Sequence, residues 1–315
     1  MQARVPLTEA MGIRPVRERA RQALVALRGE EDVPPSRWGL SSLAQLRPKI
    51  SLPLWRGRAP VPRKAIVTNL YNHTPTPIDA GWSVKKTQVR DFRGGALTYD
   101  SHNGTDFTIP IGTTVVAAAP GRVVHLHSEF NRGGLKLYLD HGDGLMTTYA
   151  HLARALVSVG DVLERGQPIA LSGYSGIDGV VTFPWGTPHV HFNAWLDATP
   201  VDPFPHGDAV SLWRAGALPV PPDDAEVEPY VPSTYDEAAV DALVASCVTP
   251  SVREELAAVP DLATRAERAI IARNYYPTRF PGSASPYAAR AQRRPRLDLP
   301  FSAEDFDGIV FADEI

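Results

Sequence analysis

Apolar residues alternate with polar ones in several short stretches between about residues 64 and 207, and this pattern predicts β-strands. These stretches are rich in β-branched and aromatic residues and read TTVVAAA, GRVVHLHSEF, LKLYLDHG, LMTTYAHL and PHVHFNAW. Glycine-containing turns separate them, and Pro120-Gly121 and Gly142-Asp143-Gly144 are typical hairpin signals. Because no long helical pattern intervenes, we expect a mainly β core, built as a compact antiparallel sandwich or partly closed barrel.

The flanks of this core follow a helical pattern. One helix is expected around Arg14–Arg28, and another over Leu262–Asn274. Thr234 and Glu237 have the spacing of a capping box, and Thr249 precedes a proline, as N-cap residues often do.

The change of pattern divides the chain into three regions. We expect a Pro- and Arg-rich N-terminal extension over residues 1–63, a β domain over 64–210, and a helical and extended C-terminal region over 211–315. The arginines of the first helix form a basic face, which in most proteins is a solvated surface.

Composition and net charge narrow the classes of partner and location that the chain could have. A net charge of −3 gives no electrostatic reason to expect nucleic acid as a partner. The single cysteine, Cys247, cannot form an internal disulfide, and its helical context is typical of a buried thiol. The first residues lack the apolar segment of a secretory signal, and no run approaches the roughly 20 apolar residues of a membrane span.

Histidine is the residue that carries the chemistry. The strongest local signal is His189-Val-His191, because residues i and i+2 of a strand point to the same face. One imidazole could then bind a metal while the other acts on substrate. His102-Asn-Gly-Thr-Asp106 is the second signal, since a turn can bring an imidazole and a carboxylate to one ion. His151 ends the stretch TTYAHL and is a candidate by position alone.

Two other histidine sites are weaker. His125-Leu-His127 has the same spacing of two residues but no carboxylate turn beside it, so we expect a solvent-facing or supporting pair. His141 precedes a Gly-Asp-Gly turn and is expected to fix a hairpin rather than bind metal.

Read in order, His102-x-x-x-Asp106, Tyr149-Ala-His151-Leu and His189-x-His191 resemble the motifs of LytM/lysostaphin-type M23 peptidases. The resemblance covers about residues 98–206 and includes IPIGTTVVAAAPGRVV, LDHGDGLMTTYAHL and VSVGDVLERGQPIALSG. It implies the family's LytM-like duplicated hybrid fold. It also implies that zinc is held by His102, Asp106 and His191, and that His151 and His189 are the catalytic histidines.

The chain departs from the family pattern at two places. The link before His189 is longer than usual, and its residues Phe183, Pro184 and Trp185 are expected at the rim of the site. Asn193 stands where the family often has an acidic residue. Neither departure changes a ligand position.

The resemblance implies a zinc-dependent endopeptidase acting on peptidoglycan stem or cross-bridge peptides, in the cell envelope or outside the cell. A non-catalytic module that binds cell wall or regulates another hydrolase is the main alternative. A lipoyl- or biotinyl-type carrier is disfavoured, because its lysine must lie at a hairpin tip and Lys136 lies within a strand pattern. The flanks are expected to supply no zinc ligand, although they could cover the groove.

The acidic end of the chain suggests one form of such a cover. As a hypothesis, a carboxylate from this tail reaches the open zinc position and blocks it. The candidates are Asp305, Asp307, Asp313 and Glu314.

Overall fold

A mainly antiparallel sheet forms the centre of the computed structural model, which describes residues 4–74, 76–77, 81–223, 229–282 and 284–315. Eleven strands are present in this part of the chain. In chain order they are β1 (Lys64–Asn69), β2 (Thr105–Thr108), β3 (Thr114–Val116), β4 (Gly121–Glu129), β5 (Gly134–Asp140), β6 (Leu145–Ala155), β7 (Val162–Leu163), β8 (Pro168–Ser172), β9 (His189–Leu196), β10 (Thr199–Val201) and β11 (Gly308–Phe311).

The strand order is β11-β1-β2-β9-β6-β5-β4-β7, with β10 paired to β9 and β8 paired to both β6 and β3. Every pair is antiparallel except β1 with β11. The mainly β, antiparallel core predicted from the sequence is therefore confirmed, and the sheet does not close on itself.

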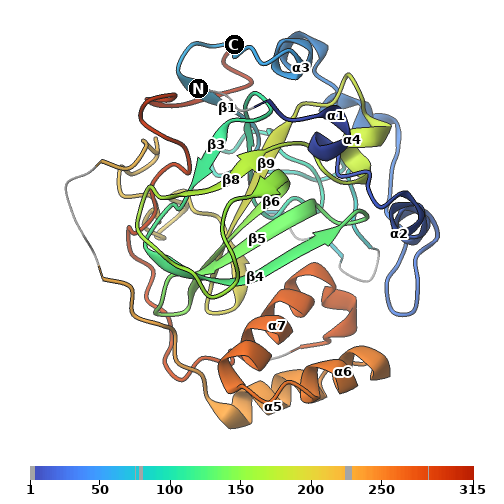
Figure 1. The fold of residues 1–315 in the computed structure, drawn as a ribbon, viewed down its shortest axis with the longest axis vertical. Helices are drawn as coiled ribbons and strands as arrows, with labels where there is room; N and C mark the ends of the chain where they lie inside the picture. Colours follow the sequence, from blue (N-terminus) through green and yellow to red (C-terminus); the bar gives the residue numbers. More distant parts are fainter. Residues whose placement is uncertain (1–3, 75, 78–80, 224–228, 283) are drawn as a thin grey trace.

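Helices lie at the periphery of the sheet (Figure 1). They are α1 (Leu7–Ala10), α2 (Val16–Arg28), α3 (Pro48–Trp55), α4 (Ile177–Val181), α5 (Glu237–Ala245), α6 (Pro250–Ala257) and α7 (Leu262–Tyr275), with 3-10 turns η1 (Leu40–Gln45) and η2 (Pro277–Arg279). The helices expected around Arg14–Arg28, after Thr234, after Thr249 and over Leu262–Asn274 correspond to α2, α5, α6 and α7. Helices α5, α6 and α7 pack together below β4 and β5 in Figure 1. No helix in the described ranges has both the length and the apolar character needed to cross a membrane.

The expected capping box at the start of α5 is wrong. The N-cap is Asp236, whose side chain accepts a hydrogen bond from the Ala239 amide at 2.8 Å. Thr249 is the N-cap of α6 as expected, but its hydroxyl donates to the Asp32 carboxylate at 2.7 Å instead of capping the helix.

The two faces of the sheet have different roles, and β9 shows how the sequence assigns them. Val190, Phe192 and Ala194 point into the main hydrophobic core, in which Leu152 is also fully buried. The alternate residues of β9 face the other side, where Trp195 packs with residues of α5 and α7. The histidines therefore share a face with the C-terminal helices.

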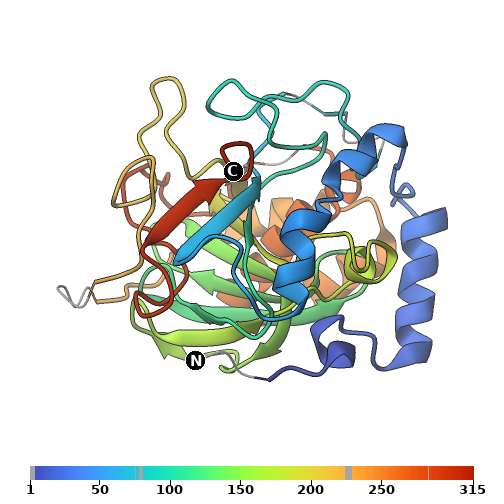
Figure 2. The ribbon, with the colours of Figure 1, turned by 90° about the horizontal axis from the view of Figure 1, so that it is seen from above.

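The C-terminal tail is part of this core. Leu297, Leu299 and Phe301 are fully buried, and β11 runs beside β1 in parallel, as Figure 2 shows. Asp298 between the two leucines is also buried, and its carboxylate pairs with Arg165 at 3.0 Å and Arg214 at 3.1 Å.

The blocking-tail hypothesis is consequently wrong, because the acidic residues of the tail are engaged elsewhere. Asp307 forms an ion pair with Lys64 Nζ at 2.8 Å. Asp313 forms one with Arg93 at 2.7 Å. Glu314 lies 3.6 Å from the same arginine, and the Asp305 amide donates to Ser302 O in the turn before β11.

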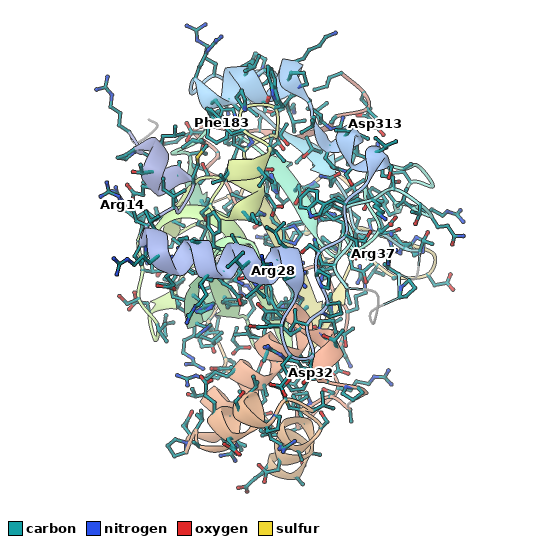
Figure 3. All side chains as sticks on the ribbon, turned by 90° about the vertical axis from the view of Figure 1, so that its right-hand side faces the viewer. Arg14, Arg28, Asp32, Arg37, Phe183 and Asp313 are labelled. Carbon is teal, nitrogen blue, oxygen red and sulfur yellow. The ribbon has the colours of Figure 1, made fainter. Side chains whose placement is uncertain are left out.

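The N-terminal flank wraps along one side of the molecule. In Figure 3, α2 crosses the sheet between Arg14 and Arg28, and the chain then reaches the C-terminal helices at Asp32. The basic face is only partly a solvated surface, because Arg19 is buried and donates to the Ser128 hydroxyl at 2.8 Å. Whether the three sequence regions are separate domains stays a prediction.

Candidate metal centre and active site

The candidate site lies on three neighbouring strands, β2, β9 and β6. Asp106 on β2 stands directly opposite His191 on β9, and Thr108 stands opposite His189. On the other side of β9, His191 is paired with Ala150 of β6. Paired residues point to the same face, so the register places Asp106 and both β9 histidines together.

His102 joins this group from the turn before β2. Its Nδ1 lies 2.7 Å from Leu70 O, and because a carbonyl only accepts, Nδ1 carries the proton and Nε2 faces the cluster with its lone pair. Asn193 fixes the same turn by donating to Asn103 O at 2.8 Å. Asn193 therefore has a structural role at the position where the family often has an acid.

Gly104 allows the turn to approach β9 this closely. A Cβ atom there would lie 2.6 Å from Phe192 O and 2.9 Å from His191 Nε2. Since the first of these contacts is with backbone, no side chain fits at position 104 without moving β9 or the turn.

Three acceptor atoms converge at the centre of the cluster. His102 Nε2 lies 3.0 Å from Asp106 Oδ1 and 3.1 Å from His191 Nδ1, and the last two atoms are 2.8 Å apart. Tetrahedral ligands at bond lengths of roughly 2.0–2.1 Å lie about 3.3 Å from one another, so this triangle is close to the size that zinc requires. Two nitrogens and one carboxylate oxygen are also the donor types that zinc prefers.

Asp106 is held as a carboxylate. Asn69 on β1 donates to its second oxygen, Oδ2, at 2.8 Å. Burial raises the pKa of Asp106, but the neighbouring imidazoles of His102, His189 and His191 favour its carboxylate form and hold the pKa well below its usual range.

His151 reaches the site through a bulge in β6. Leu135 pairs with Leu152 and Leu137 with Tyr149, so two residues of β6 oppose one residue of β5. His151 has a φ of 59°, in the left-handed region that few non-glycine residues adopt. In a regular strand its side chain would point away from the face of Ala150, and the bulge turns it back toward the β9 histidines.

Both remaining histidines present Nε2 to the site. His151 Nδ1 donates to Ser175 O at 2.8 Å, and His189 Nδ1 donates to Thr187 O at 2.7 Å. The two rings are 4.7 Å apart, centroid to centroid, and His189 Nε2 lies 3.4 Å from Asp106 Oδ1. Burial and the charge of His189 lower the pKa of His151 well below its usual value, so this imidazole is neutral at pH 7.

Residues 100–203 match the sequence profile of peptidase family M23. This segment belongs to that family. The chain is 34% identical over 128 residues to the peptidoglycan DD-endopeptidase ShyA of Vibrio cholerae. The aligned residues make up 40% of this chain and 28% of ShyA. The chain is also 34% identical over 125 residues to lysostaphin of Staphylococcus simulans, covering 38% and 24%. The chain thus spans about a quarter of the length of these curated relatives.

Similarity to solved structures is confined to part of the chain. The catalytic domain of lysostaphin from Staphylococcus simulans aligns with a TM-score of 0.32 at 27% identity, over 44% of this chain and 89% of that domain. A zinc-containing peptidase from Vibrio cholerae aligns with a TM-score of 0.33 at 28% identity, over 45% and 38%.

The other histidines of the M23 segment lie outside the cluster. His125 and His127 stack on each other along β4, with ring centroids 5.7 Å apart. His141 is buried and joins Pro120 O to the Thr147 hydroxyl, so it fixes a hairpin as expected. In the described part of the chain, the only group of three potential ligands within 4.8 Å of one another is His102, Asp106 and His191.

The walls of the M23 site contain residues that the sequence motifs did not indicate. A cavity of about 70 Å³ beside His151 and His191 is also lined by Tyr99, Arg132 and Asp178. Residues from both flanks line it as well, namely Ser36, Trp38, Asn274 and Tyr275. A cavity of about 650 Å³ reaches His102 and shares several of these lining residues, Arg132 among them.

Phe183, Pro184 and Trp185 do not line either cavity. Instead they pack against α3: the Phe183 ring lies 5.0 Å from that of Trp55, and Ser51 donates to Pro184 O at 2.9 Å. Phe183 lies near α3 in Figure 3. The rim position expected for these residues stays a prediction, and the long link contributes Ile177 and Asp178 to the smaller cavity.

Proposed function

We propose that this protein is a zinc-dependent endopeptidase that hydrolyses peptide bonds in peptidoglycan. The observation that carries the proposal is the triangle formed by His102 Nε2, Asp106 Oδ1 and His191 Nδ1, with two further imidazoles directed at it. The triangle lies in a segment of peptidase family M23. All five positions of the family motif keep their residues.

His102, Asp106 and His191 would hold the metal. Zinc bound there supplies Lewis acidity for the attack of water on a peptide carbonyl. The supporting contacts are of the kind that orients metal ligands: Leu70 O fixes the His102 tautomer, and Asn69 fixes the carboxylate of Asp106. His191 leaves the cluster accessible, because 12% of its side chain is exposed and it lines the smaller cavity.

His151 and His189 would transfer the protons. Since each donates Nδ1–H to a carbonyl, each presents Nε2 to the reacting groups. A neutral imidazole accepts a proton at Nε2, and a protonated one donates from it. One ring takes the proton of the attacking water and returns it to the leaving amine, while the other donates a hydrogen bond to the carbonyl oxygen as negative charge develops.

The names of the relatives support a substrate class. ShyA is named a peptidoglycan DD-endopeptidase, and ALE-1 of Staphylococcus capitis, 36% identical over 110 residues, a glycyl-glycine endopeptidase. We therefore assign to this chain the stem or cross-bridge peptides of peptidoglycan, which places its action in the cell envelope or outside the cell.

Digestion of purified peptidoglycan, with masses of the released products, tests the proposal. The zinc-loaded protein is expected to release peptides whose masses show one cleaved bond. His127→Ala, which changes a histidine outside the cluster, should release the same products, whereas His151→Ala should release none. Binding to peptidoglycan without any release by the wild-type protein would instead identify a non-catalytic cell-wall module.

A further inference from the structure

The turn between β4 and β5 carries a charged side chain to the edge of the site. This turn is docked against the segment that orients His151: Ser175 Oγ accepts from the Leu135 amide at 2.9 Å, and the Ile177 amide donates to Phe130 O at 2.7 Å. Gly134 permits the contact, because a Cβ atom there would lie 2.2 Å from Ser175 O. The turn and the candidate catalytic histidine are therefore held by the same residue.

Arg132 extends from this turn and lines both cavities. Its guanidinium carbon lies 5.3 Å from the centre of the Trp82 ring and 5.7 Å from that of Tyr276, so the planar group is held between two aromatic side chains. One of its nitrogens, Nη1, is buried and has no hydrogen-bond partner among the described residues.

Glu129, the acidic residue nearest to Arg132 on the same hairpin, already bonds to two other side chains. Glu129 accepts from Lys136 Nζ at 2.9 Å and from the Tyr276 hydroxyl. Lys136 in turn also donates to Arg132 O at 2.8 Å. Arg132 is thus fixed in place by its backbone and its aromatic neighbours, and Nη1 keeps an unused hydrogen-bond donor although Asp178 lines the same cavity.

Burial lowers the pKa of Arg132, with Tyr276, Glu129 and Asp178 opposing the shift. An arginine nevertheless keeps its charge in a protein, so this half-buried group is a cation with one buried, unused donor. A buried cation is stabilised by an anion that accepts its hydrogen bonds, and the planar fork of arginine fits a carboxylate better than any neutral acceptor.

We propose that Arg132 is a specificity residue that binds a carboxylate of the peptide substrate in the cavity beside the metal cluster. The proposal rests on the proposed function, because it takes the substrate to be a peptide. A peptide offers α-carboxylates and acidic side chains as its anions, and Arg132 lies where two cavities meet next to His102, His151 and His191.

Isothermal titration of the zinc-loaded protein, residues 1–315, tests this assignment. The ligands are peptides released from peptidoglycan, N-acetylated, and either left with free carboxylates or converted fully to carboxamides. The wild-type protein is expected to bind the carboxylate form about ten- to hundredfold more tightly, as charge-assisted hydrogen bonds imply. In Arg132→Gln this preference should fall to within about twofold, and Arg132→Lys should keep part of it.

Arg56→Gln is the matched control, because Arg56 is exposed and lines neither cavity. Its preference should equal that of the wild-type protein, and zinc content and thermal unfolding show whether each variant is folded. A preference that persists in Arg132→Gln overturns the assignment, as does equal or absent binding of both peptides to the wild-type protein. Binding with the expected preference but without hydrolysis of peptidoglycan contradicts the peptidase proposal alone.

Discussion

Asp106 and His191 face each other across the β2–β9 ladder, and Asp106 Oδ1 lies 2.8 Å from His191 Nδ1. The two residues are 85 positions apart in the sequence, and the sheet register alone brings them together. His102 reaches the same point from the adjoining turn, at 3.0 Å from Asp106. A site built in this way depends both on its side chains and on the backbone pairing of β2 with β9.

Removing a proposed ligand should remove the metal. His102→Ala, Asp106→Ala and His191→Ala each leave two of the three proposed ligands. We therefore expect the wild-type protein to hold about one zinc per chain and each variant to lose it. Elemental analysis after purification without chelator measures this. Retention of zinc by His191→Ala together with its loss in His189→Ala would reverse the assignment within the His-x-His pair.

The proposed catalytic histidines should behave differently. His151→Ala and His189→Ala are expected to keep zinc but to lose at least about a hundredfold in kcat, because general acid–base catalysis contributes factors of roughly 10² to 10⁴. Initial rates on peptidoglycan, normalised to zinc content, measure the effect. Near-normal turnover in either variant would remove that histidine from the mechanism.

Asn69 should matter although it does not touch the metal position. Its amide orients the Asp106 carboxylate from behind, and loss of such a contact typically weakens metal affinity about 10- to 100-fold. Asn69→Ala should therefore show this loss in a competitive zinc titration. Thr68→Val is the control, because the Thr68 hydroxyl bonds only to that of Thr108 on the neighbouring strand; an equal loss in both variants would indicate general damage to β1.

Much of the site could be predicted from local sequence, because period-two alternation governs β9. That rule placed His189 and His191 on one face, and the register confirms it. His151 does not follow the rule, since a bulge and a positive φ turn its side chain. Its position at the end of a strand made it a candidate, but only the resemblance to a family gave it a role.

Residues that enter the site through long-range contacts left no local signal. Asn69 reaches Asp106 from another strand, and Arg132 and Asp178 line one cavity although the first lies in the β4–β5 turn and the second in α4. The prediction for the C-terminal tail was wrong for a related reason. Its acidic residues suggested a carboxylate that blocks the zinc position, whereas the buried Leu299 and Phe301 join the tail to the core.

Acidification should destabilise the fold partly through a histidine outside the site. Burial lowers the pKa of His141 to about 4, whereas the unfolded value is about 6.5. As the pH falls through 6.5 the unfolded chain binds a proton that the folded chain does not, so the free energy of unfolding decreases until about pH 4, by on the order of 3 kcal/mol.

His141→Gln removes this titration. Urea unfolding at pH 7 and at pH 4.5 should show a smaller loss of stability for the variant than for the wild-type protein. Equal losses in both proteins would mean that His141 does not contribute to the pH dependence.

The central claim is that hydrolysis requires one zinc ion at the His102–Asp106–His191 cluster, and a zinc titration tests it most directly. The chelator-treated protein is mixed with increasing zinc, and peptides released from purified peptidoglycan are quantified by mass spectrometry. We predict no release without metal and a rise to a plateau at about one equivalent of zinc. Full activity after complete removal of zinc, or no activity at any zinc concentration, would contradict the account.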